Sequence, residues 1–301
     1  MNFLQMIRIF WKFCRPHTII GTSIAVLTVY FLVTAHSHLF FQNLNLLVLA
    51  WISCVAVNIY VVGINQIADW KVDQVNKPFL PLASGELSKT MGWFMSLSMG
   101  LMALVSSYLQ GMFLFIAVSF IFMIGTAYSV PGLYLKGRPV WACLAISVAR
   151  GLTLILGSFL YFQKAIFGSI QISPSIFAFA FFNFCFGMVI SLMKDAPDLA
   201  GDKLYGINTL TVRVGARAVF LLAVSIVTVA YVALSVAAAF SFSAVSALFL
   251  ALSHGAILGL AWFRLLKLDY SKSEGLYSYY MLFWKFFYLE FGLFALVYAV
   301  Q

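Results

Sequence analysis

The residues best suited to chemistry in this chain of 301 residues are acids that gather in two short segments. The first segment, 65–86, reads NQIADWKVDQVNKPFLPLASGE, and within it Asn65, Asp69 and Asp73 recur every four residues. Side chains spaced in this way lie on one face of a helix. The first segment therefore predicts three oxygen-bearing side chains that point in one direction.

The second segment, 194–202, reads KDAPDLAGD and places Asp195, Asp198 and Asp202 three and four residues apart. Five of the nine acids of the chain are the aspartates of these two segments. Carboxylates that share a cavity repel one another and are costly to desolvate unless a cation compensates them. Because oxygen ligands select hard cations, we predict bound Mg²⁺, with Mn²⁺ as the alternative, sharing its coordination with phosphate oxygens.

Basic side chains accompany the two acidic clusters and would complete the neutralisation of a bound diphosphate. They are Lys77, Lys136, Arg138 and Lys194. An isolated aspartate at a helix end is more often a solvated cap than a ligand. Two matched clusters with neighbouring cations instead favour a site that holds a diphosphate between metal ions.

The composition indicates that membrane-spanning helices position these acids. Hydrophobic residues make up 63% of the chain and charged residues 9%, and the mean hydropathy is +1.01. An ordinary soluble domain carries roughly 25% charged residues. The net charge of +9 does not indicate nucleic acid, since we find neither a soluble basic domain nor a basic stripe with interleaved aromatics. We predict a single membrane domain over residues 1–301.

Nine apolar stretches are long enough to cross a bilayer, which takes about 20 residues. They lie at about 17–35, 44–69, 90–109, 112–130, 140–162, 174–194, 216–239, 243–264 and 277–299. The arm before them, 1–16, mixes basic and apolar side chains, which predicts an amphipathic helix in the membrane interface.

The basic residues predict the orientation of the spans, because Lys and Arg of short loops stay on the cytoplasmic side. With the N-terminus in the cytoplasm, fifteen of the eighteen basic residues fall in cytoplasmic segments. Only Lys164 falls in an outside loop, while Arg150 and Lys285 fall within spans. This orientation places both acidic clusters at the cytoplasmic ends of the second and sixth spans.

The positions of the two clusters also predict an internal duplication. Four-helix repeats at about 16–138 and 139–264 would each carry an acidic cluster at the end of the second helix, followed by a polar loop. The ninth helix, 277–299, would stand outside the repeat.

Cysteines and histidines indicate neither metal binding nor covalent catalysis. The four cysteines are far apart, show no CxxC spacing and are interpreted as small core residues. They are Cys14, Cys54, Cys143 and Cys185. The histidines are scattered, so no pair of nucleophile and base is recognisable. They are His17, His36, His38 and His254.

The two aspartate segments resemble the signature motifs of the UbiA-type intramembrane prenyltransferases. Together with WKFCRPHTIIGT and GTAYSVPGLYLKG, they are most similar to the homogentisate prenyltransferases, the phytyl-transferring type of tocopherol synthesis. The resemblance extends over nearly the whole chain. No long plastid-targeting extension or signal peptide is recognisable, which favours a bacterial cytoplasmic or thylakoid membrane with the active site toward the cytoplasm.

The resemblance implies nine transmembrane helices around a central cavity, with a polar cap on the cytoplasmic side. It also implies that Mg²⁺ makes diphosphate a better leaving group, so that an electron-rich aromatic ring attacks the prenyl cation. The implied metal ligands are Asn65, Asp69, Asp73, Asp195, Asp198 and Asp202, and the implied catalytic residues are Asp69, Asp73, Asp198 and Asp202. The implied reaction transfers a phytyl or geranylgeranyl group to homogentisate with decarboxylation.

Two further polar positions are candidates for substrate binding. Arg150 lies inside the fifth span, where an unpartnered guanidinium is costly, so we predict that it pairs with a motif acid or binds the carboxylate of the acceptor. Tyr128 lies near Pro131, and both a break that faces the cavity and an ordinary helix end are consistent with this pattern. Aromatic side chains could line a groove for the prenyl tail, but the Phe-rich run 177–187 is more typical of packing or lipid contact.

Two alternatives remain beside homogentisate prenylation. The first keeps the chemistry and changes the acceptor to a 4-hydroxybenzoate-like or other quinone precursor, a chlorophyllide or a glyceryl phosphate. The second is a cation-coupled transporter, because intramembrane carboxylates also mark ion pathways. A transporter should carry acids near the bilayer midplane, whereas these lie at helix ends. The expected partners are an isoprenyl diphosphate, an aromatic acceptor and the lipid bilayer, with no obligate protein partner.

Overall fold

The computed structural model describes residues 3–300, and this range contains helices and no β-strand. Nine helical segments in this range are long and apolar enough to cross a membrane. They are Pro16–Thr34, Phe41–Ala68, Lys89–Gln110, Met112–Ser129, Pro139–Phe167, Pro174–Lys194, Ala216–Ser241, Ala244–Leu266 and Ser273–Ala299. The predicted all-α fold with nine spans is confirmed, although the fifth span is longer than predicted.

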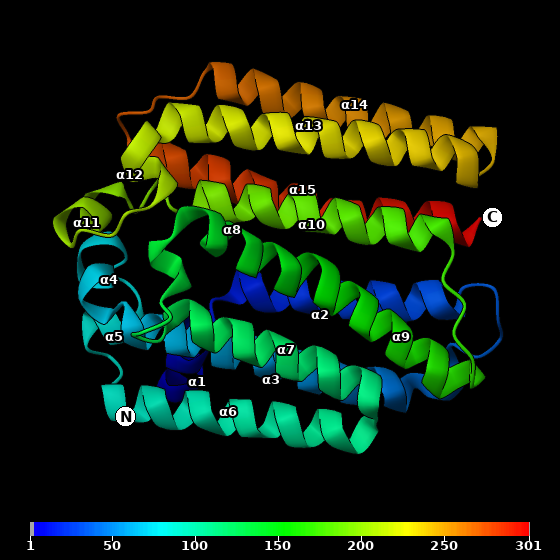
Figure 1. The fold of residues 1–301 in the computed structure, drawn as a ribbon, viewed down its shortest axis with the longest axis horizontal. Helices are drawn as coiled ribbons and strands as arrows, with labels where there is room; N and C mark the ends of the chain where they lie inside the picture. The colour runs from blue at the N-terminus through cyan, green and yellow to red at the C-terminus, as the bar shows by residue number, and fades with distance from the viewer. Residues whose placement is uncertain (1–2, 301) are drawn as a thin grey trace.

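Two of the spans are composite (Figure 1). The second begins with a 3₁₀ turn, Phe41–Asn43, and continues as α3, Leu44–Ala68. The fifth is α8, Pro139–Ser147, a π-helical turn, Val148–Thr153, and α9, Leu154–Phe167. The others are the single helices α2 (Pro16–Thr34), α6 (Lys89–Gln110), α7 (Met112–Ser129), α10 (Pro174–Lys194), α13 (Ala216–Ser241), α14 (Ala244–Leu266) and α15 (Ser273–Ala299).

Four short helices gather at one end of the long ones, on the left in Figure 1. They are α4 (Trp70–Asn76), α5 (Pro81–Ser84), α11 (Leu199–Leu204) and α12 (Leu210–Val214). Pro81 begins α5, and Gly85, with a φ of 80°, follows its end, which is the usual placement of both residue types. This end contains both acidic segments and forms a polar cap on the bundle.

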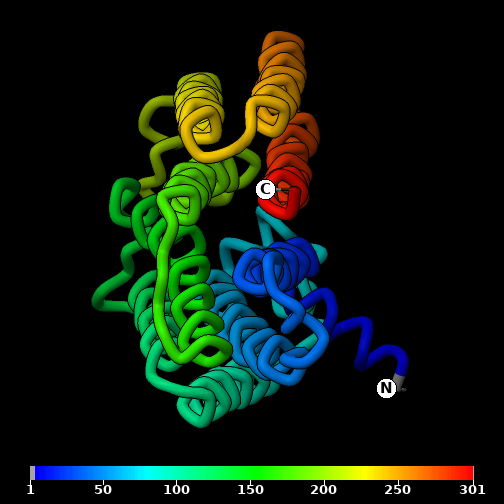
Figure 2. The backbone as a smooth tube through the Cα atoms, turned by 90° about the vertical axis from the view of Figure 1, so that its right-hand side faces the viewer, coloured from blue at the N-terminus to red at the C-terminus, as the bar shows by residue number. Residues whose placement is uncertain are grey.

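The long helices form two neighbouring groups when viewed end-on (Figure 2). One group contains α2, α3, α6, α7 and α9, and the other contains α10, α13, α14 and α15. The groups are joined where α2 packs against α15 and where α10 packs against α8 and the π-helical turn. The predicted duplication is a statement about ancestry and internal symmetry, and it stays a prediction.

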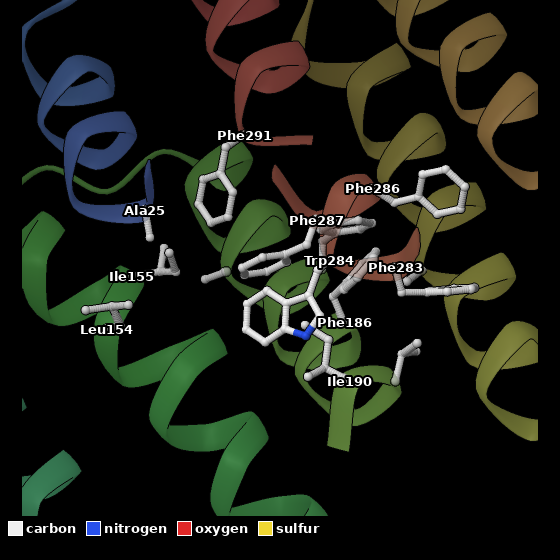
Figure 3. Close-up of a cluster of buried hydrophobic side chains, with 14 of the residues drawn as sticks. Ala25, Leu154, Ile155, Phe186, Ile190, Phe283, Trp284, Phe286, Phe287 and Phe291 are labelled. Carbon is white, nitrogen blue, oxygen red and sulfur yellow. The ribbon is translucent and has the colours of Figure 1, made fainter. Parts of the chain in front are cut away.

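Aromatic side chains fill the junction between the two groups (Figure 3). Trp284, Phe287 and Phe291 of α15 are each at most 2% exposed and lie close to Phe186 and Ile190 of α10. The Phe-rich run 177–187 of α10 has two faces. Phe179, Phe182 and Phe186 are buried, whereas Phe177 and Phe181 are more than half exposed. The run therefore serves both packing and the lipid-facing surface.

Helix α1, Phe3–Phe13, lies beside the polar cap as a separate amphipathic helix. Phe13 is fully buried, and its carbonyl accepts a hydrogen bond from Gln66 Nε2 (2.6 Å), while Trp11 is 48% exposed. Lys12 Nζ pairs with Glu86 Oε1 at 2.9 Å, which fastens α1 to the loop after α5. The cysteines are free thiols, and Cys185 alone among them is not fully buried, in agreement with their predicted packing role.

Candidate active site

The first acidic segment is helical, but it bends at its central acid. Helix α3 ends at Ala68, and Asp69, with φ −94° and ψ 8°, separates it from α4. The backbone hydrogen bonds from Asp69 N to Asn65 O (2.9 Å) and from Asp73 N to Asp69 O (2.8 Å) preserve the four-residue spacing. The three side chains face the same cavity, as predicted, although they belong to two helices with Asp69 at the junction.

The second acidic segment is the connection between α10 and α11. Asp195 follows the last residue of α10, Asp198 precedes α11, and Asp202 lies in the first turn of α11. Helix α11 packs against α4, so the two acidic segments meet. At the contact, Gly201 N donates to Asn76 Oδ1 at 2.8 Å, and a Cβ on residue 201 would lie 2.5 Å from that oxygen. A larger residue at position 201 would therefore displace the Asn76 amide and break this hydrogen bond.

Lysines neutralise the aspartates of both segments. Lys136 Nζ lies 2.6 Å from Asp69 Oδ2, which also accepts a hydrogen bond from Asn65 Nδ2 at 2.8 Å. Lys77 pairs with Asp198 of the other segment and lies 3.8 Å from Asp73 Oδ1. Lys77 thus bridges the two acidic clusters.

Arg15 belongs to the same site, although no site role had been predicted for it. Its Nη2 lies 3.6 Å from Asp73 Oδ2, and its Nε is buried without a hydrogen-bond partner. Its φ of 49° lies in the left-handed region, which is uncommon for a residue with a side chain and costly to maintain. The only sequence signal for this role is that Arg15 directly precedes the proline that begins the first span.

A cavity of about 380 Å³ connects the polar cap to the interior of the bundle. Nine of the predicted site residues line it, namely Asn65, Asp69, Asp73, Lys77, Tyr128, Lys136, Arg150, Lys194 and Asp198. Below them the wall is largely apolar and is formed by residues such as Val57, Ile121, Ile124, Leu154 and Ile190. His17, Asn58, Tyr280 and Trp284 also line the cavity, and no role had been predicted for any of them.

Three predicted site residues lie outside the lining. Arg138 is exposed and precedes α8. Asp195 Oδ1 pairs with Lys194 Nζ at 2.6 Å, so it orients a lysine that does line the cavity. Asp202 is 2% exposed and lies behind the wall. The structure thus brings together the core of both motifs but not every residue of the predicted set.

Arg150 has no acidic partner, because no ion pair formed within residues 3–300 involves it. The first of its two predicted roles, pairing with a motif acid, is therefore contradicted for the described part of the chain. Tyr128, close to the end of α7, is 7% exposed and lines the cavity, and Lys194 Nζ lies 5.5 Å from its ring centre. Tyr128 thus lies at a helix end that faces the cavity, and its role in substrate binding stays a prediction.

Burial and neighbouring charges change the protonation of the acids in the polar cap. Burial raises the pKa of Asp73, and the charges of Arg15 and Lys77 oppose this effect. Burial, reinforced by Asp195, raises the pKa of Asp202 to about 7. Both carboxylates are therefore poorly solvated, and an additional cation nearby would stabilise their charged forms.

Lys136 responds to both effects as well. Burial alone would lower its pKa, but the neighbouring Asp69 carboxylate raises the pKa above its usual range. This lysine is consequently a permanent cation in the site.

The donors of this site suit a hard divalent cation, since they are carboxylate and amide oxygens. Asp73 Oδ2 and Asp202 Oδ2 are buried without a hydrogen-bond partner, which leaves lone pairs free for a cation. Within residues 3–300, however, no three His, Cys, Asp or Glu side chains already form a metal-binding group. Lys77 and Lys136 instead serve as the counter-ions of Asp198 and Asp69. A metal ion would have to replace these ammonium groups.

Comparison with known proteins gives a consistent result over nearly the whole chain. The UbiA prenyltransferase family matches residues 23–287. Homogentisate phytyltransferase from Synechocystis sp. is 35% identical over 297 residues, which cover 97% of this chain and 96% of that protein. Homogentisate phytyltransferase 1, chloroplastic, from Arabidopsis thaliana is 36% identical over 299 residues, covering 96% of this chain and 75% of that protein.

A solved structure shares the fold. The UbiA homolog from Archaeoglobus fulgidus bound to GPP and Mg²⁺ superposes with a TM-score of 0.67 over 97% of each chain, at 17% sequence identity. The arrangement of helices in this chain is therefore that of a solved UbiA homolog.

Proposed function

The chain belongs to the UbiA prenyltransferase family, and on that premise we propose that it transfers a phytyl or geranylgeranyl group from its diphosphate to homogentisate. One observation carries this proposal. A single cavity joins a cluster of carboxylates and basic groups at the polar cap to an apolar interior. A prenyl diphosphate has the same division into a charged head and an apolar tail.

The polar cap is the part suited to the diphosphate. Lys77, Lys136 and Lys194 line the cavity and can donate to its oxygens, with Arg15 beside them. Mg²⁺ would be held by Asn65, Asp69, Asp73 and Asp198, with Asp202 behind the wall as a supporting charge. Bound Mg²⁺ supplies Lewis acidity that makes diphosphate a better leaving group, and Mn²⁺ is the alternative ion.

The apolar wall is the part suited to the prenyl chain. Side chains such as Val57, Ile121 and Leu154 would shield the allylic carbon from water. Exclusion of water matters because water would otherwise capture the allylic cation and give an alcohol. The apolar wall thereby favours attack on the cation by the aromatic ring over attack by water.

The proposed reaction is balanced without an oxidant or a covalent enzyme intermediate. The allylic C–O bond breaks, and diphosphate leaves with the electron pair. A ring carbon activated by a neighbouring hydroxyl bonds to the prenyl carbon and loses its proton. The bond between the side-chain methylene and its carboxylate breaks, CO₂ leaves, and the methylene takes up one proton to become a methyl group.

We also propose that the polar cap faces the cytoplasm of a bacterial cell, in the cytoplasmic or thylakoid membrane. The distribution of basic residues supports this orientation, since fifteen of eighteen fall on one side of the predicted spans. Reaction of an impermeant amine reagent with Lys71 and Lys89 in sealed inside-out vesicles, but not in right-side-out vesicles, is the expected result.

The test of the proposed function is product formation by the purified protein in detergent. Radiolabelled phytyl and geranylgeranyl diphosphates are supplied with Mg²⁺ and a panel of acceptors, in parallel with a chelator. We expect a prenylated, decarboxylated product from homogentisate that disappears when the divalent ion is removed. Product from another acceptor but none from homogentisate would refute the acceptor and keep the chemistry.

The two earlier alternatives fare differently. The panel of acceptors tests the first alternative, in which the acceptor is a 4-hydroxybenzoate-like or other quinone precursor, a chlorophyllide or a glyceryl phosphate. The cation-coupled transporter is set aside, because the family to which the chain belongs consists of prenyltransferases.

A further inference from the structure

Arg150 is presented to the cavity by an irregular turn in the middle of a membrane span. It lies within the π-helical turn Val148–Thr153, which interrupts the span Pro139–Phe167. Turns of this kind inside α-helices are frequent at functional sites. Arg150 comes eleven positions after Pro139, so its Cα lies about 16 Å along the helix axis from the start of α8.

Gly151 lets α10 pack closely against this turn. A Cβ on residue 151 would lie 2.3 Å from the backbone nitrogen and Cα of Phe184 in α10. Backbone atoms cannot move away cheaply, so α10 can pack against the turn only because residue 151 is glycine. Gly151 thus faces α10, while the preceding residue, Arg150, lines the cavity.

Arg150 differs from the other cavity-lining cations in its partners. Lys77, Lys136 and Lys194 each pair with an aspartate, whereas no ion pair within residues 3–300 involves Arg150. An uncompensated guanidinium within a membrane span is expensive and typically marks a functional site. The missing partner is therefore an anion that the chain itself does not supply.

The neighbours of Arg150 form a rigid aromatic wall. Its Cζ lies 5.0 Å from the centre of the Trp284 ring, and the His17 ring meets the same indole edge-on at 5.0 Å. Trp284 is 2% exposed and held within the aromatic cluster of Figure 3. Gly21 of α2 lies against both side chains. A Cβ on residue 21 would lie 3.0 Å from the Trp284 indole and 3.5 Å from Arg150 Nη1, so glycine keeps the space beside them open. A planar aromatic ring with an acidic side chain suits these surroundings.

We propose that Arg150 and Trp284 form the subsite that binds the carboxylate of the aromatic acceptor; this rests on the proposed function of the cavity. A guanidinium binds a carboxylate through two parallel hydrogen bonds, and the low dielectric of the span strengthens them. The diphosphate has its own cations at the polar cap, so a deeper cation serves the second substrate. Arg150 also keeps the acceptor ionised before prenylation, and the ion pair separates when CO₂ leaves.

The test compares homogentisate with its uncharged amide, 2,5-dihydroxyphenylacetamide, in wild type and Arg150→Gln. We expect the KM for homogentisate to rise roughly 10- to 100-fold in Arg150→Gln. The KM for the prenyl diphosphate and the KM for the amide should stay unchanged. Arg264→Gln, an exposed arginine at the end of α14, is the matched control and should alter none of the three values.

Two other variants keep the test decisive if Arg150→Gln does not fold. Arg150→Lys retains the charge without the planar fork, and we expect it to lose a smaller part of the preference for the acid. Gly21→Ala crowds Trp284 and Arg150, and we expect it to raise the KM for homogentisate more than that for the amide. A shape-only effect would weaken acid and amide equally and would overturn the subsite.

The remaining outcomes separate the subsite from the proposed function. A rise in the KM for the prenyl diphosphate with an unchanged preference for acid over amide would assign Arg150 to the diphosphate and overturn the subsite alone. A wild-type protein without any transfer activity would overturn the proposed function. Equilibrium binding of radiolabelled homogentisate to wild type and Arg150→Gln would then decide the subsite, with equal affinities as the refuting result.

Discussion

Carboxylates are buried in two regions of this chain, and their basic partners differ. In the polar cap the partners are lysines on long stems, such as Lys136 and Lys77, whose side chains are 11% and 21% exposed. In the other region, between α14 and α15, Glu290 Oε2 lies 3.2 Å from His254 Nε2, and both side chains are at most 2% exposed. The ring of His254 is held by Ser235 Oγ, 2.7 Å from Nδ1.

The two regions also differ in access. Asp69, Asp73 and Asp198 of the polar cap line the cavity, whereas neither Glu290 nor His254 does. A flexible lysine can leave its acid for a ligand, but a histidine fixed between three helices cannot. The comparison teaches that an acid with a mobile lysine partner beside a cavity serves chemistry, and an acid with a fixed histidine partner between helices serves packing. Four experiments can break or sharpen this distinction.

The largest effect is expected for the acids of the polar cap. Asp69→Ala and Asp198→Ala should each lower prenyl transfer roughly 100- to 1,000-fold, because the charge balance around the leaving diphosphate is lost. The thermal unfolding temperature in detergent should fall, since Asp69→Ala leaves Lys136 and Asp198→Ala leaves Lys77 without an ion-pair partner, so transfer is compared per amount of folded protein. Asp269→Ala, in the exposed loop before α15, is the control and should keep full activity. Undiminished transfer by Asp69→Ala would refute the metal and diphosphate role.

A smaller effect is expected for the lysines. Lys77→Ala and Lys136→Ala should each raise the KM for the prenyl diphosphate roughly 10- to 100-fold through loss of a charge-assisted hydrogen bond. Lys272→Ala, an exposed lysine, is the matched control. Initial rates over a range of diphosphate concentrations measure the effect. If only kcat fell, these lysines would hold the acids in place and would not bind the substrate.

The pair of Glu290 and His254 should show the opposite pattern. Glu290→Leu should lower the stability in detergent by about 1 kcal/mol, because interhelical polar contacts within membranes have that size, and the KM values should stay unchanged. Thermal unfolding and initial rates measure the two quantities. The double variant His254→Leu/Glu290→Leu should recover part of the loss, since it leaves no unpaired polar group. A loss of activity greater than the loss of folded protein would contradict the packing role.

The smallest effect is a pH dependence of the metal-free protein. Burial raises the pKa of Asp202 to about 7, so the folded protein holds this proton more tightly than the unfolded chain does. The resulting stabilisation is complete below the ordinary aspartate pKa and is lost as the pH rises through about 7. With a chelator present, the unfolding temperature should fall by about 1–2 °C between pH 6 and pH 8. Asp202→Asn should remove this part of the slope. An unchanged slope in that variant would show that Asp202 is charged throughout this range.

Much of the fold could be predicted because its signals are local. Runs of apolar residues give the nine spans, and the positions of Asp69 and Asp198 near span ends follow from the same reading. Asp69 and Asp73 were predicted to point in one direction, and they do so because hydrogen-bonded spacing survives the bend at Asp69.

The rest depends on contacts between distant parts of the chain. The pair of His254 and Glu290 forms only when α14 packs against α15, and no spacing along the sequence reports it. The role of Arg15 depends on where the start of α2 meets α4, and the close packing beside Arg150 depends on how α10 approaches Gly151. Packing of helices decides these features, so they could not be derived from one segment at a time.

The contact between Asn76 and Gly201 has a consequence for protein engineering. Because the side-chain oxygen of Asn76 occupies the space that a side chain on residue 201 would need, residues 76 and 201 constrain each other across the two acidic segments. A chimera that exchanges residues 16–138 with a relative should bring a residue 76 that accepts the hydrogen bond of Gly201 N, or exchange both segments together. Libraries intended to change the prenyl donor should therefore keep Asn76 and Gly201 constant while they vary the cavity wall.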